Sequence, residues 1–382
     1  MNKRFFLIDL ILWMLSGIYA LVVRSRNWLF DRGLLQSKSF DFPVISVGNL
    51  TVGGTGKTPH TEYILSLLGQ SMKVAALSRG YKRKTSGFVL ADAHATGATI
   101  GDEPYQIKRK FPEVVVAVDG NRRRGIARLL ANKDLQPLSA IVLDDAFQHR
   151  YVTPGLNILI TDCNRLFTDD HILPYGRLRE SVHSKNRANI IIVSKCPEAM
   201  RPMDFRVISK KINAFPYQTL YFTTYQYAGI YPLFAGLASS QPVVTEDLKT
   251  GVFVLVVTGI VSPRGVYEHV EKYTTAYDKL VFPDHHDFSR RDYTLIKQKF
   301  DERQTPKIIL VTEKDAARMV NDTRLPDELK PCIYVLPIKV KFLAGQELKF
   351  NQQLLTYVKE HSSNPPSPAH QTHPPSPRPH PP

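Results

Sequence analysis

The residues with the clearest chemical pattern lie in GNLTVGGTGKTP, residues 48–59, between an apolar run and a helical one. A glycine-rich turn at a helix N-terminus places backbone N–H groups and the helix dipole around an anion. In such a loop Lys57 reaches the β- and γ-phosphates of a nucleotide, and the Thr58 hydroxyl binds Mg²⁺. The usual glycine six residues before the lysine is Thr51 here, so the match is incomplete. The residues predicted to bind the nucleotide are Gly53, Gly54, Thr55, Gly56, Lys57 and Thr58.

Two adjacent carboxylates, Asp144 and Asp145, follow the apolar run Ala140–Leu143 and begin the segment DDAFQH. In open α/β sheets, ligands bind at the carboxyl ends of the strands. Carboxylates at that edge can hold Mg²⁺ directly or through water. A solvated turn is the alternative, but the apolar strand that ends at this pair favours a metal-binding role.

The motifs also indicate which nucleotide is bound. A GTP-binding protein would carry Asn-Lys-x-Asp, and neither SKCP (194–197) nor TEKD (312–315) fits it. A turn and a helix cap explain TEKD without a function. Partition-type membrane ATPases have a signature lysine where this chain has Val52. We therefore expect ATP as the nucleotide and a small-molecule kinase as the protein class.

The segments that must position these residues alternate between short β-rich runs and helical stretches. Most of the runs are continuously apolar, as in strands covered on both faces. The alternation predicts a mostly parallel sheet with crossover helices. Six strands are predicted in this first set: Val44–Val47, Lys73–Leu77, Val114–Val118, Ala140–Leu143, Asn157–Ile160 and Ile190–Ser194. A second α/β set is predicted to contain strands at Val252–Thr258, Lys279–Phe282, Lys307–Val311 and Ile333–Leu336.

The predicted fold is therefore an α/β architecture like that of P-loop NTPases, with flanking helices and a second, smaller α/β domain. The Thr- and Tyr-rich stretch Thr219–Tyr227 is expected to be an exposed strand that links the two. The predicted segments are an N-terminal helix with its basic flank, a P-loop kinase domain, a strand linker, a second domain and a disordered Pro- and His-rich tail. They cover residues 1–38, 39–215, 216–240, 241–358 and 359–382.

An apolar run from Phe5 to Val23 contains Asp9 as its only charge and has basic residues on both sides. It is marginally long enough to span a bilayer, and its equally basic flanks give no orientation. A helix that lies in the interface fits equally well. A signal peptide would need a small-residue cleavage site, and a buried core helix would not need Trp13 and Tyr19 as interfacial anchors. We expect a membrane-associated helix, either spanning or interfacial.

Composition excludes several protein classes. Of 382 residues, 43% are hydrophobic and 22% charged, which excludes a wholly disordered, a collagen-like and a polytopic membrane protein. The net charge of +15 suggests a nucleic acid, an anionic membrane or a phosphorylated substrate as partner. Three widely spaced cysteines favour a reducing cytosol. The positive charge is concentrated in residues 1–38, 73–91 and 121–128, which favours a membrane together with a phosphorylated substrate. Within the last segment, Arg122–Arg124 are expected on a solvated helix face.

Several motifs, taken together and in order, resemble those of the tetraacyldisaccharide 4′-kinases, the lipid A 4′-kinases. They are GNLTVGGTGKTP, SRGY (78–81), GDEP (101–104), DDAFQH, the LRE of GRLRE (178–180) and FPDHH (282–286). The resemblance extends from the N-terminal apolar helix to about residue 355. It implies a kinase that transfers the γ-phosphate of ATP to the 4′-hydroxyl of a tetraacylated glucosamine disaccharide 1-phosphate, with Mg²⁺ as cofactor.

The resemblance also implies roles for individual residues. Asp102 resembles the general base, His285 its partner from the second domain, and Lys57 the phosphate ligand. Thr58, Glu103 and the pair after the strand, Asp144 and Asp145, would serve the metal. Weaker candidates for substrate contacts are Asn49, Arg79, Tyr81, Gln148, His149, Arg179 and Glu180. From residue chemistry alone, Asp102 and Glu103 could simply begin a helix, and either His285 or His286 could face the site.

The implied location is the cytoplasmic face of a bacterial inner membrane, with the lipid substrate and an anionic membrane surface as partners. No nucleic acid and no protein partner is required. The alternative function is a membrane-associated P-loop ATPase switch that acts on a protein partner. A nucleic-acid-binding ATPase is disfavoured, because no basic patch interleaved with aromatic residues accompanies the positive charge.

Overall fold

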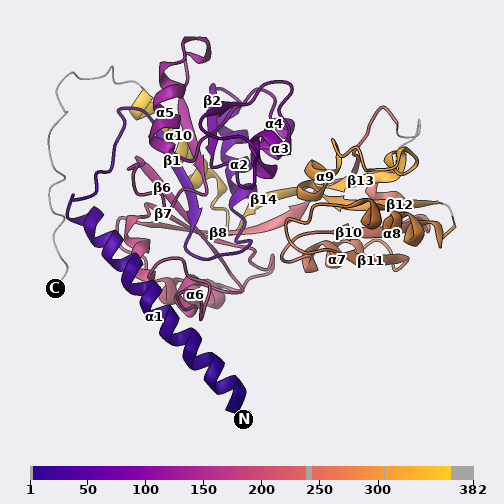
Figure 1. Ribbon diagram of the computed structural model, residues 1–382, viewed down its shortest axis with the longest axis horizontal. Helices are drawn as coiled ribbons and strands as arrows, with labels where there is room; N and C mark the ends of the chain where they lie inside the picture. Colours follow the sequence, from indigo (N-terminus) through magenta and orange to yellow (C-terminus); the bar gives the residue numbers. More distant parts are fainter. Residues whose placement is uncertain (1–2, 238–242, 305, 363–382) are drawn as a thin grey trace.

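The computed structural model describes residues 3–237, 243–304 and 306–362. Figure 1 shows two α/β units side by side and one long helix that runs along the outside of the larger unit. The predicted tail, 359–382, lies outside the described residues from 363 onward. Its first residues instead complete the last helix, α10 (Glu347–Ser362), so the prediction of disorder was wrong at the start of that range.

The larger, first unit is built on a nine-stranded sheet in the order β14-β8-β7-β6-β1-β5-β2-β4-β3. All neighbours are parallel except the edge strands β3 and β14, which confirms the predicted, mostly parallel sheet. The central strands are buried along their whole length because both faces are covered. The strands are β1 (Val44–Asn49), β2 (Val74–Ser78), β3 (Val89–Leu90), β4 (Val115–Val118), β5 (Ala140–Asp144), β6 (Leu156–Asp162), β7 (Ile190–Ser194), β8 (Thr219–Tyr227) and β14 (Ile338–Phe342).

Helices cover both faces of this sheet and complete its core. One face packs against apolar side chains of α2, α4 and α10, among them Leu65, Ile107 and Leu354. The other face packs against α5 and α6 through side chains such as Leu129 and Ile212. The helices of the first unit, besides α10, are α2 (Lys57–Gly69), α3 (Gly97–Ile100), α4 (Asp102–Lys110), α5 (Arg122–Ala131) and α6 (Pro202–Ile212).

The second unit is built on a five-stranded sheet in the order β11-β10-β12-β13-β9, in which only β9 is antiparallel. Two apolar clusters, one on each face, cover strands β10 and β12. Its strands are β9 (Tyr231–Pro232), β10 (Phe253–Thr258), β11 (Tyr277–Val281), β12 (Lys307–Thr312) and β13 (Ile333–Leu336). Its helices are α7 (Arg264–Val270), α8 (Arg290–Asp301) and α9 (Glu313–Met319).

Strand β8 differs from the exposed linker that was predicted for Thr219–Tyr227. It pairs in parallel with β7 and antiparallel with β14, inside the first sheet. Tyr221, Phe222 and Thr223 on this strand are buried. Thr and Tyr are strong strand formers that fit a covered sheet as well as an exposed one, so their composition did not reveal the burial.

The chain also returns to the first unit after the second. Strand β14 and helix α10 follow the last strand of the second sheet, yet β14 extends the first sheet and Phe350 and Leu354 of α10 enter the core of the first unit. The prediction that assigned all of 241–358 to the second domain was therefore wrong for its last part. An apolar helix after an α/β set gives no sign in the sequence of which sheet it covers.

The N-terminal helix α1 (Lys3–Asp31) is longer than the apolar run that predicted it and projects from the first unit (Figure 1). The part from Ile8 to Asp31 is long and apolar enough to cross a membrane, by length and composition only. Large apolar side chains such as Trp13 and Leu21 are exposed on it. Where α1 touches the first unit, the Ser16 hydroxyl donates to the Ile172 carbonyl at 2.8 Å.

Candidate active site

The phosphate-binding loop connects β1 to α2 and has the backbone shape that its glycines allow. Gly53 has φ 107° and Gly56 has φ 90°, a region that favours glycine. A Cβ atom on Gly56 would also collide with the Tyr225 hydroxyl, so no other residue fits there without a shift. Gly56 caps α2, and Lys57 and Thr58 therefore occupy the first turn of that helix. The loop and helix N-terminus form a cradle suited to a phosphate.

Neighbouring strands hold this loop in place. The Ser194 hydroxyl, at the end of β7, donates to the Thr55 carbonyl at 2.7 Å. Asn49 Nδ2 donates to Thr55 Oγ1 at 2.7 Å, and Gln148 Nε2 donates to the Asn49 carbonyl at 2.6 Å. Asn49 and Gln148 were predicted to contact the substrate. The structure places Asn49 fully buried beneath the loop, and it places Gln148 against the strand that leads into it.

The two carboxylates that follow β5 lie beside the first turns of α2. Asp144 is buried and accepts a hydrogen bond from Thr61 Oγ1 at 3.0 Å. Asp145 Oδ1 lies 3.6 Å from Lys57 Nζ and 3.3 Å from Arg179 Nη1. The structure thus brings the predicted phosphate ligand Lys57 and the predicted metal pair together at one edge of the sheet.

The two carboxylates differ in their electrostatic surroundings. Burial, reinforced by the neighbouring charges of Asp145 and Glu103, raises the pKa of Asp144 to about 6 despite the opposing charge of Lys57. Burial would also raise the pKa of Asp145, but Lys57 and Arg179 outweigh it and hold that pKa below its ordinary value. Asp145 is therefore ionised at neutral pH, and Asp144 would be ionised more readily beside a cation.

These residues fit a divalent cation that shares its coordination with a phosphate. Among residues 3–237, 243–304 and 306–362, no group of three or more His, Cys, Asp or Glu is arranged to hold a metal by itself. Mg²⁺ does not require such a cage, since it commonly keeps several waters and binds through one or two carboxylates plus phosphate oxygens. The Thr58 hydroxyl and the Asp144 and Asp145 carboxylates supply hard oxygen donors of that kind, and Glu103 is close enough to act on Asp144 through its charge.

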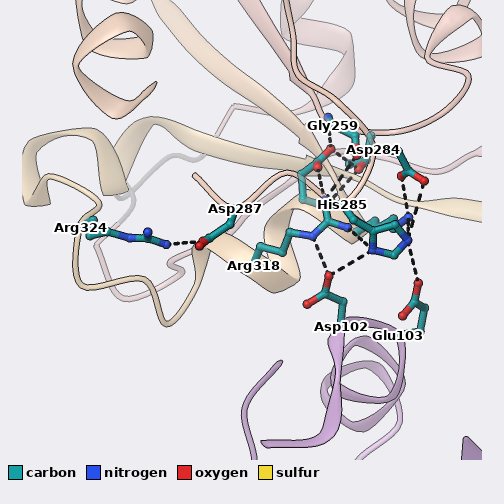
Figure 2. Close-up of polar contacts among 11 residues, drawn as sticks. Asp102, Glu103, Gly259, Asp284, His285, Asp287, Arg318 and Arg324 are labelled. Atoms are coloured by element: carbon teal, nitrogen blue, oxygen red, sulfur yellow. Dashed lines mark hydrogen bonds and ion pairs between the residues drawn. The ribbon is translucent and has the colours of Figure 1, made fainter. Parts of the chain in front are cut away.

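A second group of titratable side chains lies between the two units (Figure 2). Asp102 begins α4 of the first unit, and His285 lies in the loop that follows β11 of the second. His285 Nδ1 is 3.6 Å from Asp102 Oδ2, and His285 Nε2 is 3.7 Å from Glu103 Oε1. Glu103 thus contacts the imidazole and also influences Asp144, so the group lies next to the loop edge of the first sheet.

Two cations from α9 surround the same imidazole. Arg318 Nε donates to Asp102 Oδ2 at 2.8 Å, and Arg318 Nη2 lies 3.2 Å from His285 Nδ1. Lys314 Nζ lies 3.0 Å from His285 Nε2 and 2.8 Å from Asp284 Oδ1. Burial would raise the pKa of Asp102, but the His285 imidazole and the Arg318 guanidinium hold it below its ordinary value. Asp102 is therefore a carboxylate, able to accept a hydrogen bond, at neutral pH.

The structure also distinguishes the two neighbouring histidines. His286 Nε2 lies 3.0 Å from Asp292 Oδ2 and its ring stacks on Phe282, so it belongs to the second unit alone. His285 has φ 57°, a left-handed backbone conformation that turns its side chain toward the first unit. The geometry places His285, and not His286, beside Asp102.

The other predicted substrate contacts lie in different surroundings. Tyr81 is 58% exposed, and its ring centroid is 5.7 Å from that of His285. Arg79 is exposed on the same loop, and Arg179 points to Asp145. Both aromatic and cationic groups are therefore available on the solvent side of the site, where an acceptor could approach.

His149 and Glu180 are enclosed by protein instead. Burial and the charges of nearby arginines lower the pKa of His149 to about 4, so its ring is neutral. Glu180 is buried and paired with Arg187 at 2.7 Å, and it accepts a hydrogen bond from Asn27 of α1 at 3.3 Å. The structure therefore places Glu180 at the junction between α1 and the first unit.

Three basic residues of the site were missed by the sequence analysis. Arg122, expected on a solvated helix face, is buried, donates to the Asp144 carbonyl at 3.3 Å and has its pKa lowered to about 10 by burial. Lys314 and Arg318 were missed because TEKD (312–315) was explained as a turn and a helix cap without a function. Thr312 does cap α9, but the helix that it begins also carries these two cations. The available signal was the spacing of four residues between these two cations, which puts both on one face of a helix that begins at a strand end.

Comparisons with known proteins agree on one family. The sequence model of the family described as tetraacyldisaccharide-1-P 4′-kinase matches residues 8–359. The tetraacyldisaccharide 4′-kinase of Bacteroides thetaiotaomicron is 50% identical over 369 residues, covering 95% of this chain and 97% of that protein. The enzyme of the same name from Porphyromonas gingivalis is 41% identical, covering 90% of this chain and 96% of that protein.

The fold comparison leads to the same family. A crystal structure of LpxK from Aquifex aeolicus in complex with ATP is similar to this structure, with a TM-score of 0.68 and 27% sequence identity. The match covers 92% of this chain and 99% of that one. The resemblance seen in the motifs is confirmed, as is the prediction of a kinase. This chain belongs to the tetraacyldisaccharide 4′-kinase family.

Proposed function

We propose that the two groups of residues form one active site, which transfers the γ-phosphate of ATP to the 4′-hydroxyl of a tetraacylated glucosamine disaccharide 1-phosphate. The observation that carries this proposal is the approach of His285, from the second unit, to within 3.6 Å of Asp102 in the first. Glu103 connects this pair to the phosphate-binding edge, because it contacts His285 and raises the pKa of Asp144. A donor phosphate and an acceptor hydroxyl could therefore meet between the units.

The loop residues hold the donor in this proposal. Gly53, Gly54, Thr55 and Gly56 surround the phosphates with backbone N–H groups, and Lys57 contributes a positive charge. ATP is bound by the Aquifex relative, which supports ATP as the donor here. Thr58, Asp144, Asp145 and Glu103 would hold Mg²⁺, which when bound offsets the negative charge of the phosphates.

Asp102 and His285 act on the acceptor. A sugar hydroxyl is a weak nucleophile, and a carboxylate beside it can accept its proton as transfer proceeds. The low pKa of Asp102 keeps it ionised and ready to accept. The imidazole of His285 orients this carboxylate and can receive the proton from it. Arg79, Tyr81 and Arg179 are the candidates to bind the acceptor, because their side chains border the site.

The enzyme acts at the cytoplasmic face of a bacterial inner membrane in this proposal. Helix α1 supplies an exposed apolar surface, and the basic residues that flank it would meet anionic headgroups. An acylated acceptor lies in the same bilayer. The reaction then needs neither a protein partner nor a nucleic acid.

A transfer assay tests this function. The purified protein is incubated with γ-labelled ATP, Mg²⁺ and the tetraacylated disaccharide 1-phosphate in mixed micelles, and label in the lipid is measured. We expect the label at the 4′ position, and its loss in Asp102→Asn and His285→Gln variants that still bind ATP. Absence of label in the lipid, with ATP hydrolysis stimulated by a protein, would contradict the proposal and favour a P-loop ATPase switch.

A further inference from the structure

Helices α4 and α9 form an antiparallel pair that joins the two units. Asp102 at the start of α4 pairs with Arg318 near the end of α9, and Lys110 at the end of α4 pairs with Glu313 at the start of α9. Between these ion pairs, Ala317 of α9 packs into the core of the first unit, although α9 follows a strand of the second. We call these four charged residues, Asp102, Lys110, Glu313 and Arg318, the interdomain clamp.

Arg318 forms the end of the clamp at the active site. Its side chain is only 8% exposed. Its Nη1 donates to Asp315 Oδ1 at 3.2 Å, and Asp315, fully buried, accepts from the Gly259 N–H at 3.1 Å. The guanidinium is thus held from behind by the second unit, while its other nitrogens face Asp102 and His285 (Figure 2). Because the guanidinium is planar and rigid, it sets the separation between these two groups.

Lys110 forms the other end and extends the clamp to the phosphate-binding helix. Its Nζ lies 2.6 Å from Glu313 Oε1 of α9 and 2.6 Å from Glu62 Oε2 of α2. Glu62 is buried and also accepts from Gln106 Nε2 at 2.6 Å. Glu313 Oε2 accepts from the Ile338 N–H at 3.1 Å, where the chain re-enters the first sheet. One ammonium therefore connects α2, α4 and the second unit.

We propose that the interdomain clamp aligns His285 with Asp102, and that Arg318 and Glu313 are positioning residues for phosphoryl transfer. The four side chains of the clamp are partly buried, with exposed fractions between 8% and 29%. Desolvation offsets much of the attraction in such pairs, so they contribute little net stability, but breaking their geometry is costly. Such pairs are suited to fixing one arrangement of two units. The inference rests on the proposed function of Asp102 and His285, since a clamp matters for catalysis only if that pair is catalytic.

The cleanest test is Glu313→Gln, which removes the charge of the Lys110–Glu313 pair between the units and leaves the Lys110–Glu62 pair inside the first unit intact. The matched control is Glu302→Gln, which breaks an ion pair with Lys299 at 3.0 Å within the second unit. We expect Glu313→Gln to lower kcat about 10-fold, because a misplacement of about 1 Å at a catalytic group can cost as much as 10²-fold. The KM for ATP and the melting temperature should match those of the control.

A second measurement separates positioning from a merely structural role. Arg318→Ala should lower kcat about 100-fold, and added guanidinium, well below denaturing concentrations, should restore part of it, whereas methylammonium should not. Glu313→Gln with the kcat of the control, or Arg318→Ala with no response to guanidinium, would overturn the clamp. If Asp102→Asn and His285→Gln also keep full activity, the proposed function fails instead, so the two failures can be told apart.

Discussion

The loop edge of the first sheet and the contact between the units both place carboxylates beside cations, but they are built in different ways. Lys57, at the start of α2, and Asp144 and Asp145 follow two strands of one sheet, β1 and β5, that are hydrogen-bonded neighbours. Asp102 comes from α4 of the first unit, whereas His285 and Arg318 come from a loop and from α9 of the second, so the packing of the two units brings them together. The arrangement of the first group depends on local strand geometry, whereas that of the second depends on the relative position of the two units.

This difference suggests that the two groups have separate roles, one in nucleotide binding and one in turnover. The loop edge is held by hydrogen bonds within one unit, such as Ser194 to Thr55, so we expect it to keep its shape if the second unit moves. The group between the units exists only when both units are in place, so a motion between them would separate Asp102 from His285. We expect substitutions in the first group to affect binding and turnover together, and those in the second to affect turnover alone.

The largest effect should follow from Lys57→Met. Lys57 is the cation predicted to reach the phosphates, and its loss removes that charge and leaves Asp145 paired with Arg179. We expect a loss of about 10³-fold in kcat, in the range for removing one strong electrostatic contact to a transition state, together with weaker ATP binding. Transfer kinetics and calorimetric titration of ATP check this. An unchanged ATP affinity would remove the distinction between the two regions.

The group between the units should respond differently. Asp102→Asn keeps the shape of the side chain but removes the carboxylate, and His285→Gln replaces the imidazole by a polar side chain that does not titrate. We expect kcat to fall by about 10²- to 10⁴-fold, as for a lost general base, while the dissociation constant of ATP stays within about 3-fold. The same two assays measure it. A dissociation constant that rises in step with the loss of kcat would mean that this group also binds the nucleotide.

A smaller effect is expected from Gly56→Ala in the loop. The left-handed φ of 90° and the collision with the Tyr225 hydroxyl both oppose a side chain there. We expect a loss of about 2 kcal/mol in the free energy of unfolding and weaker ATP binding. Urea denaturation measures the stability. Adding Tyr225→Phe should recover the part due to the hydroxyl; no recovery would show that the backbone strain accounts for the whole effect.

The smallest effect concerns pH and the base of the loop. His60 Nδ1 donates to the Gly56 carbonyl at 2.7 Å, and Nε2 lies 2.9 Å from the Thr223 hydroxyl. Burial lowers the pKa of His60 from 6.5 to about 4. A lowered histidine pKa means that the folded state resists protonation. The contribution of His60 to the free energy of unfolding is therefore fully present above pH 6.5 and is lost as the pH falls toward 4.

The expected size follows from linkage. Between pH 8 and pH 5.5 this group should remove about 1.4 kcal/mol from the free energy of unfolding. In the His60→Gln variant, the free energy of unfolding should fall by that much less between pH 8 and pH 5.5. Urea denaturation of both proteins at the two pH values measures this. His149 and His269 also have pKa values lowered to about 4, so the difference between variant and parent is the informative quantity. An equal change in the free energy of unfolding between the two pH values in both proteins would contradict the prediction.

The same contrast explains what could be predicted from the sequence. Lys57 and the Asp144–Asp145 pair are specified by short patterns, because a strand end followed by a glycine turn or by carboxylates forms the same local structure in any α/β sheet. Asp102 and His285 were named only through resemblance to a family, since residue types alone left Asp102 as a helix start and His285 equal to His286. Their proximity is a property of the two packed units.

Other residues escaped prediction for physical reasons of the same kind. Arg122 lies in a run of arginines that is typical of a solvated helix face, yet it is buried. Its helix, α5, follows β4 in the same sheet, and its guanidinium donates to the Asp144 carbonyl at the end of β5. Arg318 has no motif of its own, and its role depends on the packing of α9 against α4. The β8 strand was expected on the surface, because threonine and tyrosine do not reveal how many neighbours a strand will have.

The return of the chain to the first unit has a consequence for synthesis. Residues of α10, the last helix, fill the core against which the phosphate-binding helix α2 packs, as Leu354 and Leu65 share one apolar cluster. The ribosome completes every strand of the second sheet before it makes β14 and α10. The first unit therefore keeps apolar surface exposed until β14 and α10 have been made, while the second unit already has all of its strands. A premature stop after β13 would spare the later-encoded unit and damage the one encoded first.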